Sequence, residues 1–154
     1  MSGHPSGVTV GPISADATRP LRKRVLRPHQ AIETLVYPGD TAPGALHMAA
    51  FQDGRIVGIA SLAPEAFALM PGETGAFRLR GMATEPGLRS HGIGGAVLEG
   101  AIAQVARHGA RLIWCNARVP ARSFYLRHGF QSEGDVFELP EIGPHVVMWR
   151  RLTP

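Results

Sequence analysis

Hydrophobic residues recur at helical spacing in one long stretch of the chain. Between Ile93 and Arg107, apolar side chains fall three or four positions apart, as they do on the buried face of an amphipathic helix. A His-Gly pair follows this stretch, and glycine commonly ends a helix. The spacing therefore predicts a helix over residues 93–107 that packs one face against a core.

Shorter apolar runs separated by turn residues predict strands. The runs 46–52 and 55–62 flank Asp53-Gly54, a pair typical of tight β-hairpin turns. Other strands are expected over residues 8–13, 75–84, 111–117, 130–139 and 145–152. Shorter helical segments are expected over about 14–26, 30–35 and 120–128.

The order of these elements predicts a mixed sheet. Short turns join strands in the first half, which suits antiparallel pairing, whereas the long helix separates 75–84 from 111–117, as in a parallel crossover. We expect the α/β (α+β) class: one domain over residues 1–154, with helices on both faces of a mostly antiparallel central sheet. Residues 1–7 are expected to form a loose leader.

Composition is that of a globular chain. The 154 residues are 44% hydrophobic and 18% charged, which favours one domain and argues against a disordered chain. No apolar run approaches the roughly 20 residues of a membrane span, and no signal-peptide pattern is evident, so a cytoplasmic location without membrane attachment is expected. The net charge of +4 is spread out, apart from Arg22-Lys23-Arg24. A nucleic-acid partner is therefore not expected, and a basic nucleic-acid-binding domain is the least favoured alternative.

Cysteine and histidine usage offers little further chemistry. Cys115 is the single cysteine, which excludes an internal disulfide, and its apolar neighbours favour a small buried residue. The histidines show no metal-ligand spacing, so no metal is expected.

A glycine-rich segment precedes the long helix. LRSHGIGG, residues 88–95, places three glycines where the helix begins, although glycine disfavours helices. The first helical turn leaves N–H groups without partners, and glycines let a phosphate approach them. Arg89 adds a cation with two-pronged geometry. From these residues alone, an anion site and a turn without a ligand are equally good interpretations.

Two segments together resemble a known family. RLRGMATEPGLRSHGIGG resembles motif A of the GNAT N-acetyltransferase superfamily, Arg/Gln-x-x-Gly-x-Gly/Ala after a bulged strand, here Arg89-x-x-Gly92-x-Gly94. ARSFYLRHGF, residues 121–130, resembles motif B of that superfamily. The two motifs are separated by enough chain for one helix and one strand, and the resemblance covers about residues 46–139.

The segment Ile142-Gly143-Pro144-His145 followed by Met148, with Phe124-Tyr125 upstream, is similar to the ElaA-like branch of the superfamily. Two positions depart from the usual family pattern. Arg118 stands where the family often has asparagine, and Ser90 stands where glycine usually follows the motif-A arginine.

The resemblance implies how acetyl-CoA would bind. It implies a splay between the fourth and fifth strands that admits the pantetheine arm. It also implies that the main-chain N–H of Met82 binds the acetyl carbonyl, that of Thr84 binds the pantetheine, and the glycine-rich segment binds the pyrophosphate. The cofactor-binding residues implied are Met82, Ala83, Thr84, Arg89, Ser90, His91, Gly92, Ile93, Gly94, Gly95 and Asn116.

The resemblance also implies an N-acetyltransferase in which an amine attacks the thioester directly. Tyr125 matches the family's general acid, which protonates the departing sulfur. No motif identifies the base, and Glu73, Glu85 and His145 are the candidates for a base or a substrate contact. A small-molecule or peptide amine is the expected acceptor. A non-catalytic CoA-binding sensor is the main alternative, and a homodimer is left open.

Overall fold

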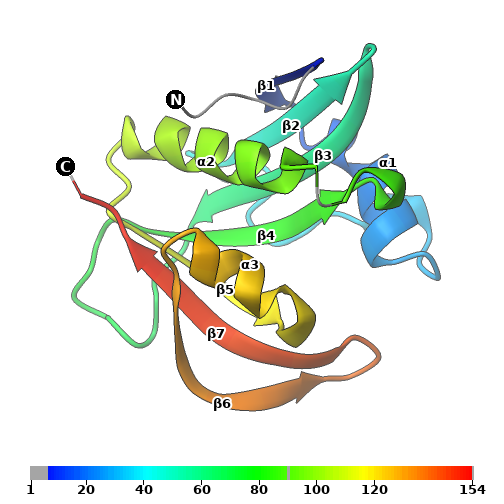
Figure 1. The fold of residues 1–154 in the computed structure, drawn as a ribbon. Helices are drawn as coiled ribbons and strands as arrows, with labels where there is room; N and C mark the ends of the chain where they lie inside the picture. The colour runs from blue at the N-terminus through cyan, green and yellow to red at the C-terminus, as the bar shows by residue number, and fades with distance from the viewer. Residues whose placement is uncertain (1–6, 90, 154) are drawn as a thin grey trace.

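The computed structural model describes residues 7–89 and 91–153, which form one mixed seven-stranded sheet in the order β1-β2-β3-β4-β5-β7-β6 (Figure 1). Neighbouring strands are antiparallel except β4 and β5, which are parallel. The expected leader, residues 1–7, lies almost entirely outside the described residues. The strands are β1 (Val8–Ile13), β2 (Leu46–Gln52), β3 (Arg55–Pro64), β4 (Ala76–Thr84), β5 (Leu112–Arg118), β6 (Gln131–Leu139) and β7 (Gly143–Arg151).

Helical segments occur where the sequence predicts them, but most are short. Within residues 14–26 the backbone changes from a 3-10 turn to a single α-helical turn and then to a π-helical turn, with Pro20 near the start of the α-helical turn. The segments are η1 (Asp16–Thr18), α1 (Arg19–Leu21), η2 (Arg22–Leu26), η3 (Ile32–Thr34), η4 (Pro86–Leu88), α2 (Ile93–Ala106), η5 (Val119–Ala121) and α3 (Arg122–Arg127).

The longest helix, α2, lies across the first four strands on one face of the sheet (Figure 1). Gly58 on β3 allows the close approach, because a Cβ atom there would lie 2.9 Å from Ile93 Cγ2. Each large aliphatic side chain buried beneath α2 contributes about 1.5–3 kcal/mol of burial free energy. The buried stripe of α2 consists of Ile93, Val97, Leu98, Ala101, Ile102 and Val105.

The N-terminal helical segment covers the opposite face. Leu21 packs there with Ala49, Ile59 and Ala83, whereas Ala50 and Ala60, the next residues along β2 and β3, belong to the core under α2. This alternation follows from the two-residue period of a strand. Helices on both faces of the sheet, as predicted, are therefore confirmed.

The two parallel strands separate after a short pairing. Their register contains Ala76 with Leu112, Phe77 with Ile113 and Arg78 with Trp114, and ends there. Residues 79–84 and 115–118 then continue as strands without pairing to each other. The predicted splay between the fourth and fifth strands is confirmed.

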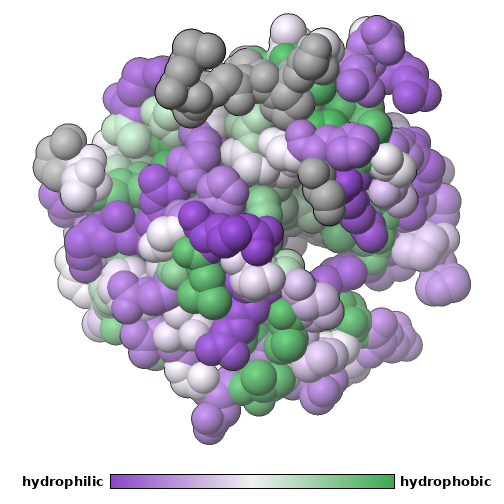
Figure 2. All heavy atoms as spheres, in the orientation of Figure 1, coloured by the Kyte–Doolittle hydropathy of each residue, from purple (hydrophilic) through white to green (hydrophobic). Residues whose placement is uncertain are grey.

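Hydrophilic side chains cover most of the face seen in Figure 2, with hydrophobic ones in scattered patches. Within the described residues, no helix is both long and apolar enough to cross a membrane.

Candidate active site

The first turn of α2 presents main-chain donors that have no partner among the described residues. The first helical hydrogen bond runs from Ala96 N to Gly92 O (3.1 Å), so the N–H groups of Ile93, Gly94 and Gly95 precede it. Gly92 caps the helix with φ 78°, a left-handed conformation that glycine adopts easily. Among the residues that the structure describes, no side chain caps this end of the helix. These N–H groups and the helix dipole make the turn suitable for an anion.

A bulge interrupts β4 beside this turn. Ile59 pairs with Ala83 and Ser61 with Arg80, so Gly81 and Met82 together lie opposite one residue of β3. Gly81 has φ 65°, which a residue with a side chain rarely adopts. Because β5 has already separated from β4 at this level, the register gives Met82 no partner strand on that side either. The main chain at Met82 is therefore available to a ligand that enters the splay.

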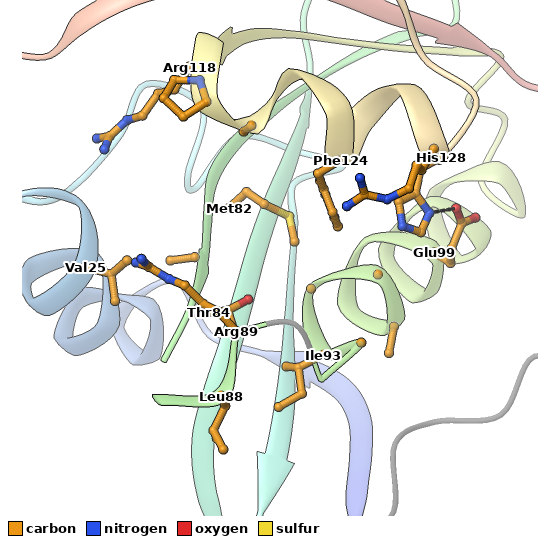
Figure 3. A pocket seen from close by; sticks show the side chains of 18 of the residues that line it. Val25, Met82, Thr84, Leu88, Arg89, Ile93, Glu99, Arg118, Phe124 and His128 are labelled. Carbon is orange, nitrogen blue, oxygen red and sulfur yellow. Dashed lines mark hydrogen bonds and ion pairs between the residues drawn. The ribbon is translucent and has the colours of Figure 1, made fainter. Parts of the chain in front are cut away.

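A cleft of about 1150 Å³ joins these two features, and we call it the α2 cleft. Figure 3 shows Ile93 at the first turn of α2, with Phe124 and His128 across from it, and the Arg89 side chain extending toward Val25. His128 Nδ1 lies 2.8 Å from Glu99 Oε2, an interaction that holds the imidazole against α2. Eight predicted cofactor-binding residues line this cleft: Met82, Ala83, Thr84, Arg89, Gly92, Ile93, Gly94 and Gly95.

A smaller cavity of about 250 Å³ lies between the splayed strands, and we call it the inner cavity. It shares Met82, Arg118 and Phe124 with the α2 cleft, so the two spaces meet at the bulge of β4. Tyr125 and His145 line only the inner cavity. The two cavities thus bring motif A and motif B to a common point.

Tyr125 keeps its phenolic proton in this setting. Its ring is buried and packs on Phe124 and Phe130, each with a centroid separation of 5.2 Å. Burial, and to a smaller extent Cys115, raises the pKa of Tyr125 well above its ordinary value of 10.0. Tyr125 is therefore protonated at neutral pH and can serve as a proton donor.

Comparison with known proteins agrees with this geometry. The model of the Acetyltransferase (GNAT) family matches residues 16–130. The chain belongs to the GNAT family. A Bacillus subtilis (strain 168) protein described as "Uncharacterized N-acetyltransferase YitI" is 40% identical over 140 residues, covering 91% of this chain and 93% of that protein. The family resemblance seen in the two motifs is therefore confirmed.

Solved structures share the GNAT fold of this chain. Escherichia coli ElaA matches with a TM-score of 0.75 at 15% identity, covering 93% of this chain and 99% of ElaA. An aminoglycoside 6'-N-acetyltransferase complexed with coenzyme A matches with a TM-score of 0.72 at 14% identity, covering 95% of this chain and 98% of that structure. At these identities the likeness concerns the fold alone.

Of the three candidate bases, the GNAT fold brings only His145 to the cavities. His145 Nδ1 lies 2.8 Å from Gly143 O, and because a carbonyl only accepts, Nδ1 carries the hydrogen. In the neutral imidazole the lone pair is then on Nε2, the nitrogen able to accept a proton. His145 is buried at the start of β7, opposite Arg118 in the register with β5.

The two carboxylate candidates lie elsewhere. Glu73 precedes β4 and forms ion pairs with Arg111 and Arg151, at the end of the strand away from Met82. Because β4 has nine residues, its ends are roughly 25 Å apart. Glu85 forms an ion pair with Arg24. Neither carboxylate lines the α2 cleft or the inner cavity.

The other predicted residues have varied positions. Asn116, on β5, lines the inner cavity rather than the α2 cleft. His91 is exposed and is not among the residues that line the α2 cleft. Ser90 lies outside the described residues. Among the described residues, no group of three His, Cys, Asp or Glu side chains could hold a metal ion.

Arg118 lies where β5 ends, and its Nη2 donates to Leu26 O at 3.2 Å. Burial, and then the nearby charge of Arg27, lowers the pKa of Arg118. In Figure 3 its side chain points away from the first turn of α2. Arg118 thus links the N-terminal helical segment to the junction of the two cavities.

Sequence reasoning missed a buried ion pair under the bulge. Arg22 is fully buried, and its Nη1 and Nη2 donate to Asp40 Oδ2 at 2.7 Å and Oδ1 at 2.9 Å. Its guanidinium also lies 4.0 Å from the centroid of the Tyr37 ring, and a Cβ atom at Gly81 would lie 3.1 Å from that ring. Within the sequence, Arg22-Lys23-Arg24 has the appearance of a solvated basic run, so no local signal identified the pair.

This network extends to the central strands. Arg22 Nη2 donates to Ser61 Oγ at 2.9 Å, and Ser61 Oγ lies 2.7 Å from His47 Nδ1. His47 Nε2 is 2.8 Å from Asp40 O, so it donates to that carbonyl. The segment before β2 is therefore tied to β2 and β3, and it holds Tyr37 against the bulge of β4.

Proposed function

We propose that this GNAT protein transfers an acetyl group from acetyl-CoA to an amine, by direct attack within a ternary complex. One observation carries the proposal: the α2 cleft and the inner cavity meet at the bulge of β4. The first leads to a helix turn suited to an anion, and the second is lined by a protonated tyrosine and a histidine. A thioester held in one space is then open to an amine arriving from the other.

Main-chain groups would hold the acetyl donor. The free N–H groups of Ile93, Gly94 and Gly95 suit a pyrophosphate, and Arg89 is exposed nearby to contact its charge. The unpaired edge of β4 suits the amides of the pantetheine arm, which would bind it as an added strand does. These contacts would position the thioester carbonyl near Met82.

Three groups would then carry the chemistry. The amine nitrogen attacks the thioester carbonyl carbon, so a C–N bond forms and the C–S bond breaks. Met82 N–H would stabilise the charge on the carbonyl oxygen. His145 Nε2 would accept the proton released by the amine, and the Tyr125 hydroxyl would protonate the departing sulfur.

Ligand-induced stabilisation tests the binding half of this proposal. Acetyl-CoA at 100 times its Kd should stabilise the native state by about 2.7 kcal/mol. At about 2–4 °C per kcal/mol for a chain of this size, that is a Tm increase of about 5–11 °C. No increase at millimolar acetyl-CoA would count against the assignment.

Thiol release from acetyl-CoA, followed with a chromogenic thiol reagent across a panel of amines, tests the catalytic half. We expect amine-dependent release that is lost in the Gly92→Val variant. Binding of acetyl-CoA without release for any amine would instead favour a CoA-binding sensor.

A further inference from the structure

The inner cavity has an unusual charge composition. Its lining includes Arg27, Arg78, Arg80 and Arg118, and among the described residues that line it none is an aspartate or a glutamate. The cavity is also small, at about 250 Å³, below the roughly 300–1,000 Å³ typical of sites for drug-sized ligands. Its charge and its size therefore both restrict the acceptor.

Two of the four arginines share one counter-charge within the protein. Glu65 Oε2 accepts from Arg78 Nη1 at 3.1 Å, and Glu65 Oε1 accepts from Arg80 Nη1 at 3.0 Å. Burial raises the pKa of Glu65, but these two arginines lower it by more, so the net shift is downward and the carboxylate is charged at neutral pH. Arg78 also lies over the Trp114 ring, 4.8 Å from its centroid. Both side chains are thus explained by interactions inside the fold.

Arg27 and Arg118 have no such counter-charge. Arg27 Nη1 donates to Leu26 O at 3.0 Å, and Arg118 Nη2 donates to the same carbonyl at 3.2 Å. Neither forms an ion pair with any residue that the structure describes. Both are half-buried, and the two like charges repel each other across a partly desolvated space. Such a pair is unfavourable in the free protein and becomes favourable when an anion binds between or beside the two guanidiniums.

We propose that the acceptor is a small amine that also carries an anionic group, a carboxylate or a phosphate, bound by Arg118 and Arg27. This inference rests on the proposed acetyl transfer. Arg118 lies at the junction where Met82 would hold the acetyl group, so an anion bound there would hold the rest of a compact acceptor close to the thioester. The same charges would repel polycationic acceptors.

Matched acceptor pairs test this inference. Phenylalanine is compared with phenethylamine, lysine with cadaverine, and O-phosphoethanolamine with ethanolamine, and kanamycin serves as a polycation. We expect kcat/KM to be at least about 10-fold higher for the anionic member of a reactive pair, since a hydrogen-bonded charge is worth about 10- to 100-fold in affinity. The carboxylate and phosphate pairs show which anion is preferred.

Variants connect that preference to the two arginines. Arg118→Gln and Arg27→Gln should each raise KM for the anionic acceptor about 10-fold or more and leave KM for acetyl-CoA unchanged. Arg118→Lys should retain part of the preference. Arg55→Gln, on the exposed β2–β3 hairpin, is the matched control and should change neither constant.

The results that would contradict the anion site differ from those that would contradict acetyl transfer. Equal or better turnover of the amines that lack an anionic group, including the polycation, would overturn the inference and leave acetyl transfer intact. A raised KM for acetyl-CoA in Arg118→Gln, with acceptor preference unchanged, would assign that arginine to the acetyl donor. If no amine in the panel is acetylated, the change in Tm is measured with CoA plus each amine. Stabilisation by the anionic amines alone supports the anion site, and equal or absent stabilisation by all amines overturns it.

Discussion

Replacing Asp40 with asparagine removes the counter-charge of the buried Arg22. The native carboxylate accepts two hydrogen bonds from the guanidinium, whereas an asparagine side chain offers one oxygen and a donor amide. Burial alone raises the pKa of Asp40, but hydrogen bonds from Arg22 and Tyr37 N–H and the charge of Arg22 lower the pKa below 3.8. The native pair is therefore ionised at neutral pH, and the variant leaves a buried cation unpaired.

The magnitude follows from that geometry. Breaking a buried pair from one side costs about 3–5 kcal/mol. Arg22 keeps Leu35 O and Ser61 Oγ as acceptors at 2.9 Å, so we expect the lower end, about 3 kcal/mol. That loss corresponds to a decrease in Tm of about 6–12 °C for a chain of this size.

Urea denaturation followed by circular dichroism at pH 7, together with calorimetry, measures this change. Asp16→Asn is the matched control, because Asp16 is 81% exposed in its ion pair with Arg19 and should change Tm little. The double variant Arg22→Met with Asp40→Leu should recover most of the loss, since it leaves no uncompensated charge. A cost below about 1 kcal/mol for Asp40→Asn would refute the reasoning, because neutral acceptors would then suffice for Arg22.

Three other predictions concern the site and the acid response. Tyr125→Phe should lower kcat about 100-fold with little change in KM for acetyl-CoA, and equal losses in both would remove its proton-donor role. Gly92→Val should abolish the acetyl-CoA-induced increase in Tm, because φ is 78° there, whereas Gly87→Ala, which meets open space, should retain it. Burial raises the pKa values of Asp40 and Glu65, but their arginine partners have the larger effect and lower them below 3.8 and 4.5 in the folded state. The free energy of unfolding, measured by urea titration, should therefore decrease as pH falls through about 4. Stability that rises on acidification would contradict that last prediction.

The local sequence pattern was sufficient to predict most of the helices and strands. The strand bounds 8–13 and 46–52 match the structure, and the predicted helix over 93–107 ends one residue earlier, at Ala106. Asp53 and Gly54 have φ values of 52° and 75°, as a tight hairpin turn requires. Such features depend on residues a few positions apart, so alternation, helical spacing and turn residues are enough to predict them.

Contacts between segments far apart in the sequence could not be predicted from such local patterns. The sequence predicted two late strands but not that β7 would lie between β5 and β6, which brings His145 opposite Arg118. It offered Glu73 as a candidate base, and the direction of β4 places that carboxylate at the far end of the strand. Strand order and direction depend on how the whole core packs, so three candidates of similar chemistry could not be ranked from their spacing.

By itself, the sequence determined the order of the elements, the glycine turn before α2 and, through its two motifs, the family. Tertiary structure alone decided which charges remain unpaired. Arg22 and Asp40 are buried together although they are 18 positions apart. Arg27 and Arg118 lie at a cavity whose described lining residues include no carboxylate. The physical reason is that an arginine's role depends on the partners and the solvent around its guanidinium, and folding brings those partners from segments far apart in the chain.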